Sequence, residues 1–185
     1  MPSFVAFSDQ VEVTDKAVSA IVDGVPERYK EIMHGILVQH GIDLKNRQEW
    51  YQQQHWLDAF REIAENIGPS TLFGIGKAIP GNAILPFQPV PPYALREALE
   101  SIDRAYQFNH RGGEIGYYRL TAFAPGRAVM ECRNPYPSDF DRGIITAMAR
   151  TFMPLGSRHL EVQLDATHPT RLAGADACTY LITWQ

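Results

Sequence analysis

The residues of this sequence that could do chemistry are two cysteines, six histidines and a dense polar segment beside one cysteine. Cys132 opens that segment, CRNPYPSDFDRGI, and Cys178 lies close to the end of the chain. A zinc site would have to join these cysteines to His159 or His168. The sequence holds no C-x-x-C and no H-x-x-x-H pair, which are spacings typical of zinc ligands. We therefore predict no metal site, and we expect both cysteines to be small buried residues on strands.

An enzyme would need Cys178 or Asp139 close to a histidine that could act as its base. The spacing along the chain pairs neither residue with a histidine. There is no G-x-S-x-G nucleophile elbow. The stretch FGIGKAIPG, at 73–81, has neither of the phosphate-loop spacings. A hydrolase or a reductase-type enzyme stays open as an alternative, but no catalytic residue is assigned.

The polar segment is better explained as a joint between a strand and a helix. Residues 134–137, Asn-Pro-Tyr-Pro, cannot form regular helix, because proline lacks an amide donor and extends the residue before it. Ser138 then precedes Asp141 by three positions, which predicts a capping box. Asp139 and Asp141 would not share a helix face, which argues against a metal site there. Gly143 inside the helix predicts close approach of another backbone.

The remaining pattern is helical in the first half and mainly extended in the second. Three- and four-residue apolar steps predict helices over 14–23, 26–39, 44–67, 92–108 and 139–153. Two-residue alternation predicts strands over 114–123, 127–134, 159–165 and 178–184. The proline-rich stretch 70–94 is expected to be irregular. We predict one α+β domain, 1–185, in which the helical half packs on a mainly antiparallel sheet of four to five strands in β-β-α-β-β order.

Composition excludes several classes of function. The chain has 185 residues, 45% of them hydrophobic, which suffices for one core without disulfides or metal. Its net charge of −4 gives no general attraction to nucleic acid or to an anionic membrane. The apolar runs are too short to span a bilayer, and the start MPSFVAFSDQ does not read as a signal peptide. We expect a cytoplasmic protein with no nucleic-acid or membrane partner.

Aromatic side chains are the feature that favours ligand binding. An apolar pocket between the helices and the sheet would suit a small apolar or aromatic ligand. Its predicted lining is Trp56, Phe60, Tyr117, Arg119 and Phe123, with Arg119 as the polar anchor. The alternative for Arg119 is that its face of the strand is simply the solvated one.

Several stretches, in this order, resemble a known superfamily. They are KAVSAIVDGV, ESIDRAYQFNHRGG, YYRLTAFAPGRAVMEC, DFDRGIITAMARTF and RLAGADACTYLITW. Over roughly residues 14–184 the chain is similar to the superfamily of four-vinyl reductase domains, haem–nitric-oxide-binding domains and TRAPP-type trafficking subunits, and especially to small bacterial relatives of unknown function. The resemblance implies an α+β ligand-binding fold and a homodimer. Some of these relatives bind aromatic effectors or haem.

The chain departs from these relatives in its cofactor motifs. The Tyr-x-Ser-x-Arg motif that holds haem propionates is absent, no histidine is assigned as an axial ligand, and only two cysteines remain. We therefore assign no cofactor and predict that neither haem nor zinc is bound. The leading hypothesis is a homodimeric small-molecule-binding or sensory domain of unspecified ligand. A dimeric scaffold subunit without ligand is a further alternative beside the enzyme.

Overall fold

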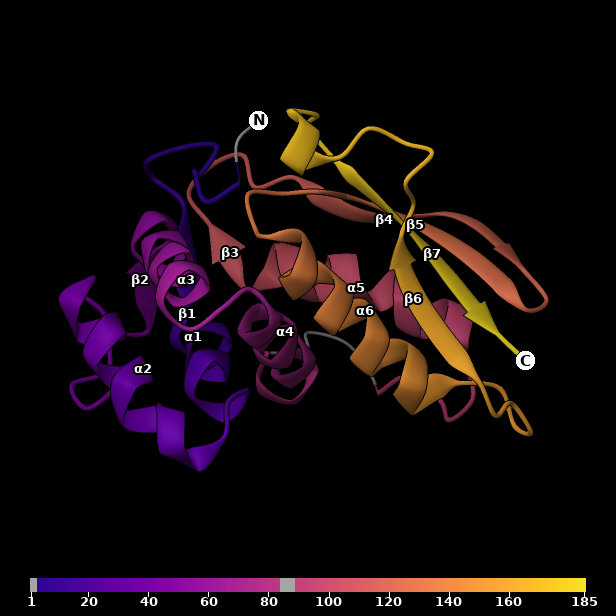
Figure 1. The fold of residues 1–185 in the computed structure, drawn as a ribbon, viewed down its shortest axis with the longest axis horizontal. Coiled ribbons are helices and arrows are strands. Elements are labelled where there is room, and N and C mark those ends of the chain that lie inside the picture. The colour runs from indigo at the N-terminus through magenta and orange to yellow at the C-terminus, as the bar shows by residue number, and fades with distance from the viewer. Residues whose placement is uncertain (1–2, 84–88) are drawn as a thin grey trace.

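The fold is a layer of helices packed on two antiparallel sheets (Figure 1). The computed structural model describes residues 3–83 and 89–185. The helices are α1 (Asp15–Asp23), α2 (Glu27–Gln39), α3 (Gln53–Asn66), α4 (Ser70–Asn82), α5 (Leu95–Phe108) and α6 (Ser138–Phe152), with a short turn of 3-10 helix, η1 (Arg171–Ala173). The strands are β1 (Glu12–Thr14), β2 (Trp50–Gln52), β3 (His110–Arg111), β4 (Tyr117–Ala124), β5 (Arg127–Arg133), β6 (Leu160–Leu164) and β7 (Cys178–Trp184).

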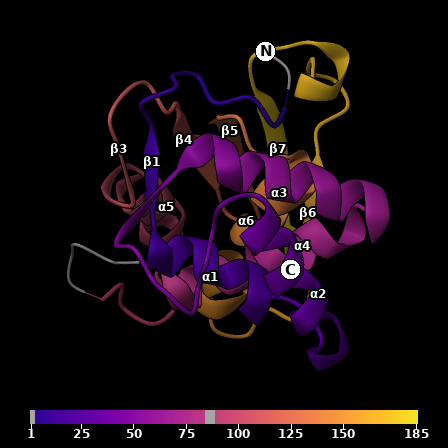
Figure 2. The same cartoon turned by 90° about the vertical axis from the view of Figure 1, so that its left-hand side faces the viewer.

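The four-stranded sheet of the second half has the order β4-β5-β7-β6. All its neighbours pair antiparallel, and α5 and α6 lie across one of its faces (Figure 1). A smaller sheet, β2-β1-β3, ties the start of the chain to the end of α5. Figure 2 looks from the side of α1, α2 and α3, which stand in front of the larger sheet. The predicted α+β class and the β-β-α-β-β order of the second half are confirmed.

Helix α4 corrects the prediction of an irregular segment over 70–94. Residues Ser70–Asn82 are helical, although Pro80 lies in the last turn. The reason is packing against α6: a side chain on Gly76 would overlap the carbonyl of Phe140, and a Cβ on Gly143 would lie 3.0 Å from the Cα of Gly76. The two backbones therefore touch, which confirms the close approach predicted at Gly143. Tertiary contact has overridden low helix propensity. Residues 84–88 of the predicted segment lie outside the described residues.

The joint between β5 and α6 was predicted correctly, but its capping box was not. Pro137 occupies the cap position, and no side chain caps α6. Ser138 is instead the first residue of the helix, and its hydroxyl oxygen lies 3.3 Å from the sulfur of Cys178. Asp141 points into the interior, where it is fully buried. There the carboxylate pairs with the guanidinium of Arg171, which is a stronger partner than an exposed backbone amide would be.

Two further expectations can be compared with the observed elements. Thr14 caps α1 as predicted, accepting a hydrogen bond from the amide of Ala17 at 3.4 Å. Helix α5 begins at Leu95, three residues later than the predicted Pro92.

Among the helices in the described part of the chain, none combines the length and the apolar character that crossing a membrane requires.

Candidate functional site

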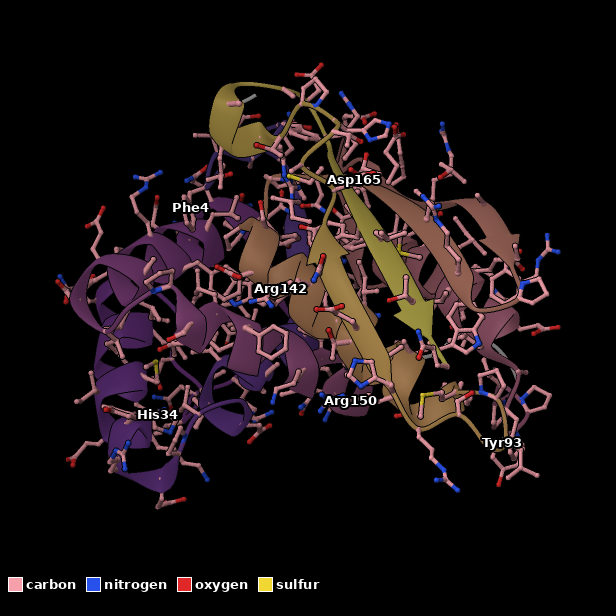
Figure 3. The ribbon with its side chains drawn as sticks, turned by 45° about the vertical axis from the view of Figure 1, so that its right-hand side comes forward. Phe4, His34, Tyr93, Arg142, Arg150 and Asp165 are labelled. Atoms are coloured by element: carbon pink, nitrogen blue, oxygen red, sulfur yellow. The ribbon has the colours of Figure 1, made fainter. Side chains whose placement is uncertain are left out.

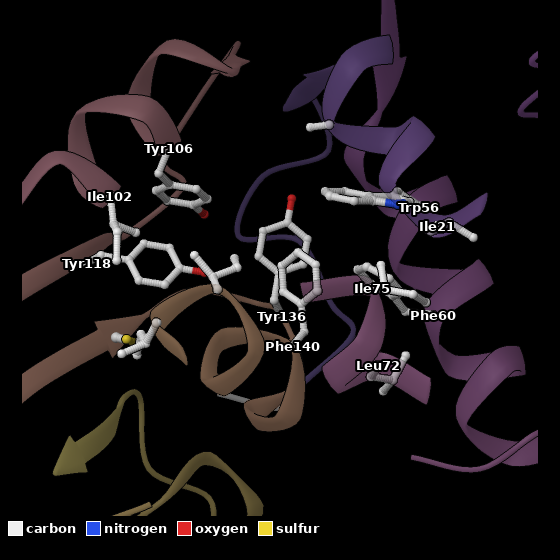
Figure 4. Packing of buried hydrophobic residues seen from close by; sticks show 14 of the residues in the cluster. Ile21, Trp56, Phe60, Leu72, Ile75, Ile102, Tyr106, Tyr118, Tyr136 and Phe140 are labelled. Atoms are coloured by element: carbon white, nitrogen blue, oxygen red, sulfur yellow. The ribbon is translucent and has the colours of Figure 1, made fainter. Parts of the chain in front are cut away.

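A cavity of about 420 Å³ opens between α4, α5 and α6, on the helical side of the larger sheet. Its volume lies within the range usual for small-molecule sites, about 300–1,000 Å³. Aromatic and aliphatic side chains make up most of its wall: Trp56, Ile79, Ile102, Tyr106, Tyr118, Tyr136, Phe140, Ile144, Met148 and Phe152. Figure 4 shows how Tyr106 of α5, Tyr118 of β4, Tyr136 of the joint before α6 and Phe140 of α6 converge, with Trp56 facing them from α3. The geometry suits a ligand with a large apolar surface.

His110 is one of the titratable groups on this wall. It follows the end of α5 and is 8% exposed. Its Nδ1 lies 2.8 Å from the carbonyl oxygen of Tyr106, so Nδ1 carries the proton and donates it. Its Nε2 lies 2.6 Å from the hydroxyl of Tyr136, which must then be the donor. Burial lowers the pKa of His110 from 6.5 to about 4, so the imidazole is neutral at physiological pH.

Gln53 extends this chain of hydrogen bonds to helix α3. Its amide nitrogen donates to the hydroxyl of Tyr136 at 2.9 Å. Burial raises the pKa of the Tyr136 phenol, which keeps the hydroxyl protonated and able to donate. The chain runs in one direction, from Gln53 through Tyr136 and His110 to the Tyr106 carbonyl. It fixes the tautomer of His110 and the position of the Tyr136 ring.

A buried ion pair supports the other end of the cavity, behind Tyr118. The hydroxyl of Tyr118 donates to Asp141 at 2.6 Å, and the guanidinium of Arg171 pairs with the same carboxylate. Asn134 donates to Asp141 at 3.2 Å and accepts from Arg171. Burial raises the pKa of the Asp141 carboxyl, although Arg171 and the two neutral donors oppose this shift. The cluster locks the β6–β7 connection onto the start of α6.

Two of the predicted pocket residues lie in or behind this wall. Trp56 lines the cavity and is 1% exposed. Phe60, one turn later on α3, is fully buried, and its ring centroid lies 4.9 Å from that of Trp56. Phe60 is not part of the cavity lining. It supports Trp56 from behind.

The other three predicted pocket residues lie on β4, outside the cavity lining. Arg119 has 61% of its side chain exposed and stacks on Tyr117, with its guanidinium carbon 4.1 Å from the ring centroid. Phe123 packs on Trp184 with ring centroids 5.5 Å apart. Side chains alternate along a strand, and it is Tyr118 that points inward. Tyr117 and Arg119 therefore lie on the face of β4 opposite Tyr118, and Arg119 is no anchor for a ligand in this cavity. A bulge between Leu120 and Ala122 returns Phe123 to the face of Tyr118, where it contacts Arg96 of α5 outside the cavity lining.

The enzyme alternative would require an acid or a thiol hydrogen-bonded to a histidine in a cleft. In the described part of the chain, the acids in contact with a histidine are Asp165, 3.1 Å from His168, and Glu62, 2.7 Å from His40. Asp165 lies in the outer β6–β7 loop, labelled in Figure 3, and neither pair lines the cavity. Asp139 pairs with Arg142, and Cys178 contacts Ser138.

Sequence reasoning missed His110 and left the role of Tyr136 open. One available signal was the spacing of Tyr106 and His110, which are four residues apart at the end of an amphipathic helix. Residues at this spacing share a helix face, and the face of Tyr106 was expected to point inward. A second was Tyr136-Pro-Ser138, which matches the first two positions of the Tyr-x-Ser-x-Arg motif. Phe140 stands at the third position and lines the cavity where that motif has its arginine.

The fold is similar to several solved structures. An H-NOX protein from S. oneidensis in the Fe(II)NO ligation state gives a TM-score of 0.62 at 13% identity, covering 92% of this chain and 98% of that one. An oxygen-binding H-NOX domain related to soluble guanylate cyclases gives 0.59 at 13% identity, covering 91% and 93%. No family model matches the chain, and no curated protein matches it.

The chain has the H-NOX fold. This supports the haem–nitric-oxide-binding part of the predicted resemblance, while the four-vinyl reductase and TRAPP-type parts stay predictions. The prediction that haem is not a cofactor is wrong. It rested on missing motifs, whereas the solved structures that share this fold include an H-NOX protein used to probe the function of heme distortion. Within residues 3–83 and 89–185, no group of three or more His, Cys, Asp or Glu could hold a metal ion, but haem requires only one protein ligand.

Proposed function

We propose that this chain is a ligand-binding sensor domain whose ligand occupies the cavity between α4, α5 and α6. The observation that carries the proposal is His110: a buried, neutral imidazole on a mainly apolar wall, with its orientation set by the Tyr106 carbonyl. A few fixed polar groups in a mainly apolar cavity are typical of small-molecule sites. The fold that this chain shares with H-NOX structures also supports a ligand-binding sensor domain.

Haem is the ligand that we propose first. The Nδ1–H to carbonyl bond of His110 is the contact that usually orients a metal-binding histidine, and the lowered pKa keeps Nε2 unprotonated. Lys77 is exposed on the rim of the cavity, where an ammonium could pair with a propionate. The fit requires one change, because the Tyr136 hydroxyl must release Nε2. Bound haem would supply an iron atom able to take a diatomic gas.

Titration of the purified protein with ferric haem tests this proposal. We expect a Soret band that saturates at one haem per chain and a matching mass in native mass spectrometry. His110→Ala should abolish the shifted Soret band, whereas His55→Ala, at an exposed histidine, should leave it unchanged. Tyr136→Phe should strengthen binding, because it frees Nε2. Equal spectra for the protein and His110→Ala would refute His110 as the ligand.

A small apolar or aromatic ligand without metal is the second candidate. The cavity wall supports it, since Ile102, Tyr118 and Phe140 need no metal to pack against an aromatic ring. Thermal shift across a panel of aromatic compounds, with Ile144→Trp to fill the cavity, would separate this candidate from haem. The same native mass spectra test the predicted homodimer, and a dimer with neither haem nor aromatic ligand would favour the scaffold alternative.

A further inference from the structure

Cys132 and Cys178 face each other across two neighbouring strands. They are direct partners in the antiparallel pairing of β5 with β7, and both are fully buried. Directly opposed residues in such a pair have Cα atoms about 4.5 or about 5.5 Å apart and point to the same face. Both separations fall within the range of about 4.4–6.8 Å that disulfides span. The backbone separation of such a pair is therefore one that a disulfide can span.

The surroundings of Cys178 differ from those of Cys132. The sulfur of Cys178 lies 3.3 Å from the Ser138 hydroxyl and 3.4 Å from the backbone amide of Arg171. It also lies beside the first turn of α6, a helix of 15 residues whose amino end favours negative charge. These groups place hydrogen-bonding partners and the amino end of a helix against this sulfur. Burial raises the pKa of the Cys132 thiol, so that residue stays protonated.

We propose that Cys132 and Cys178 form a redox-active pair that a peroxide oxidises to a cross-strand disulfide in the folded protein. The Cys178 thiolate attacks one peroxide oxygen, so an S–O bond forms, the O–O bond breaks, and the departing hydroxide takes up a proton to become water. The Cys132 sulfur then attacks the sulfenic sulfur. An S–S bond forms, the S–O bond breaks, and the Cys132 proton leaves with the hydroxide as a second water.

Turn η1 is the part of the fold that would admit the peroxide. The amide of Arg171 covers Cys178, and the next residue, Leu172, is 78% exposed. One short turn therefore lies between this sulfur and solvent. Its opening would also release the buried Arg171–Asp141 pair, and it requires less free energy than global unfolding. The proposal does not depend on haem or on any occupant of the cavity.

Treatment of the folded protein with hydrogen peroxide tests the pair. We expect the number of alkylatable thiols to fall from two to zero, the intact mass to fall by two hydrogen atoms, and one proteolytic peptide pair to contain both residues. Diamide, which accepts both thiol hydrogens at its N=N bond, should give the same product without any peroxide chemistry at bound haem. The oxidised chain should unfold at a higher temperature than the reduced one.

Single variants assign the two roles. Cys132→Ala should stop at a sulfenic acid on Cys178 that dimedone traps, and Cys178→Ala should leave Cys132 unmodified. Ser138→Ala should slow oxidation several-fold, because one hydrogen bond to the thiolate is lost. Circular dichroism confirms that each variant is folded. Two unreacted thiols in the folded protein, or links between chains only, would overturn the proposal.

Discussion

The Tyr136 hydroxyl lies 2.6 Å from Nε2 of His110, inside a mainly apolar wall. This contact joins two segments far apart in the chain, the end of α5 and the joint before α6. Because Nδ1 of His110 already donates to a carbonyl, protonation of Nε2 would make it a second donor to the Tyr136 oxygen, beside Gln53, and the phenol proton would lose its acceptor. Acid should therefore weaken this chain of hydrogen bonds before it disrupts the rest of the core.

The first prediction concerns stability against pH. His110 has a pKa of about 4 in the folded chain and 6.5 when unfolded, so between these values the unfolded state binds more protons. The free energy of unfolding should fall as pH drops from about 6.5 to about 4, by roughly 3 kcal/mol from this group. Urea unfolding at a series of pH values measures the slope.

Two variants isolate the histidine in that experiment. His110→Gln should flatten the pH dependence in this window, whatever its effect on absolute stability. His159→Gln, at an exposed histidine, should keep the slope of the unmodified chain. If His110→Gln kept that slope too, the pKa of His110 would not be lowered.

The second prediction concerns the Tyr136 hydroxyl. Tyr136→Phe leaves Nε2 of His110 and the amide of Gln53 buried without a partner, which should destabilise the fold by about 1–3 kcal/mol. Tyr117→Phe is the matched control, because its hydroxyl contacts Glu131 at a partly exposed edge and its loss should change stability by about 0.5 kcal/mol at most. Equal losses in the two variants would contradict the buried chain of hydrogen bonds.

Most of the elements could be predicted because their local patterns agree with the fold. Thr14, the Gly126 turn and the alternation of β7 each specify their structure from neighbouring residues alone. Helix α4 could not be predicted in this way. Gly74, Gly76 and Pro80 disfavour helix locally, and only contact with α6 compensates for them.

The site was harder to predict than the elements. Trp56 was found because its apolar stripe repeats at helical spacing. The strand β4 was assigned correctly, but the choice between its faces depends on a neighbour distant in sequence: Asp141 draws the hydroxyl of Tyr118 inward. His110 has only its spacing from Tyr106 as a local signal, and the burial of Arg171 is explained by partners elsewhere in the chain, so no local pattern marks Arg171.

The third prediction tests the contact between α4 and α6. Gly143→Ala places a methyl group against the backbone of Phe73 and Gly76, and should destabilise the fold by about 1–3 kcal/mol or more. Gly35→Ala, in the exposed middle of α2, meets no atom within 4 Å and should stabilise it by about 0.5–1 kcal/mol. Thermal unfolding of both variants gives the comparison. A Gly143→Ala variant as stable as Gly35→Ala would mean that the two helices are not in backbone contact.

The fourth prediction concerns the buried pair of Asp141 and Arg171. Arg171→Met leaves the Asp141 carboxylate without its cation in the interior, and should destabilise the fold by about 3–5 kcal/mol. The double variant Asp141→Leu, Arg171→Met should lose less than the sum of its two single variants, because neither charge is then buried alone.

Arg96 supplies the control for this cycle. It pairs with Glu100 on the exposed face of α5, so Arg96→Met should change stability by about 0.5 kcal/mol at most. Strictly additive losses at Asp141 and Arg171 would show that the two groups do not interact, and that the β6–β7 connection is held to α6 by other contacts. A coupling of about 1 kcal/mol or more would instead identify this pair as the link between the start of α6 and the turn that covers Cys178.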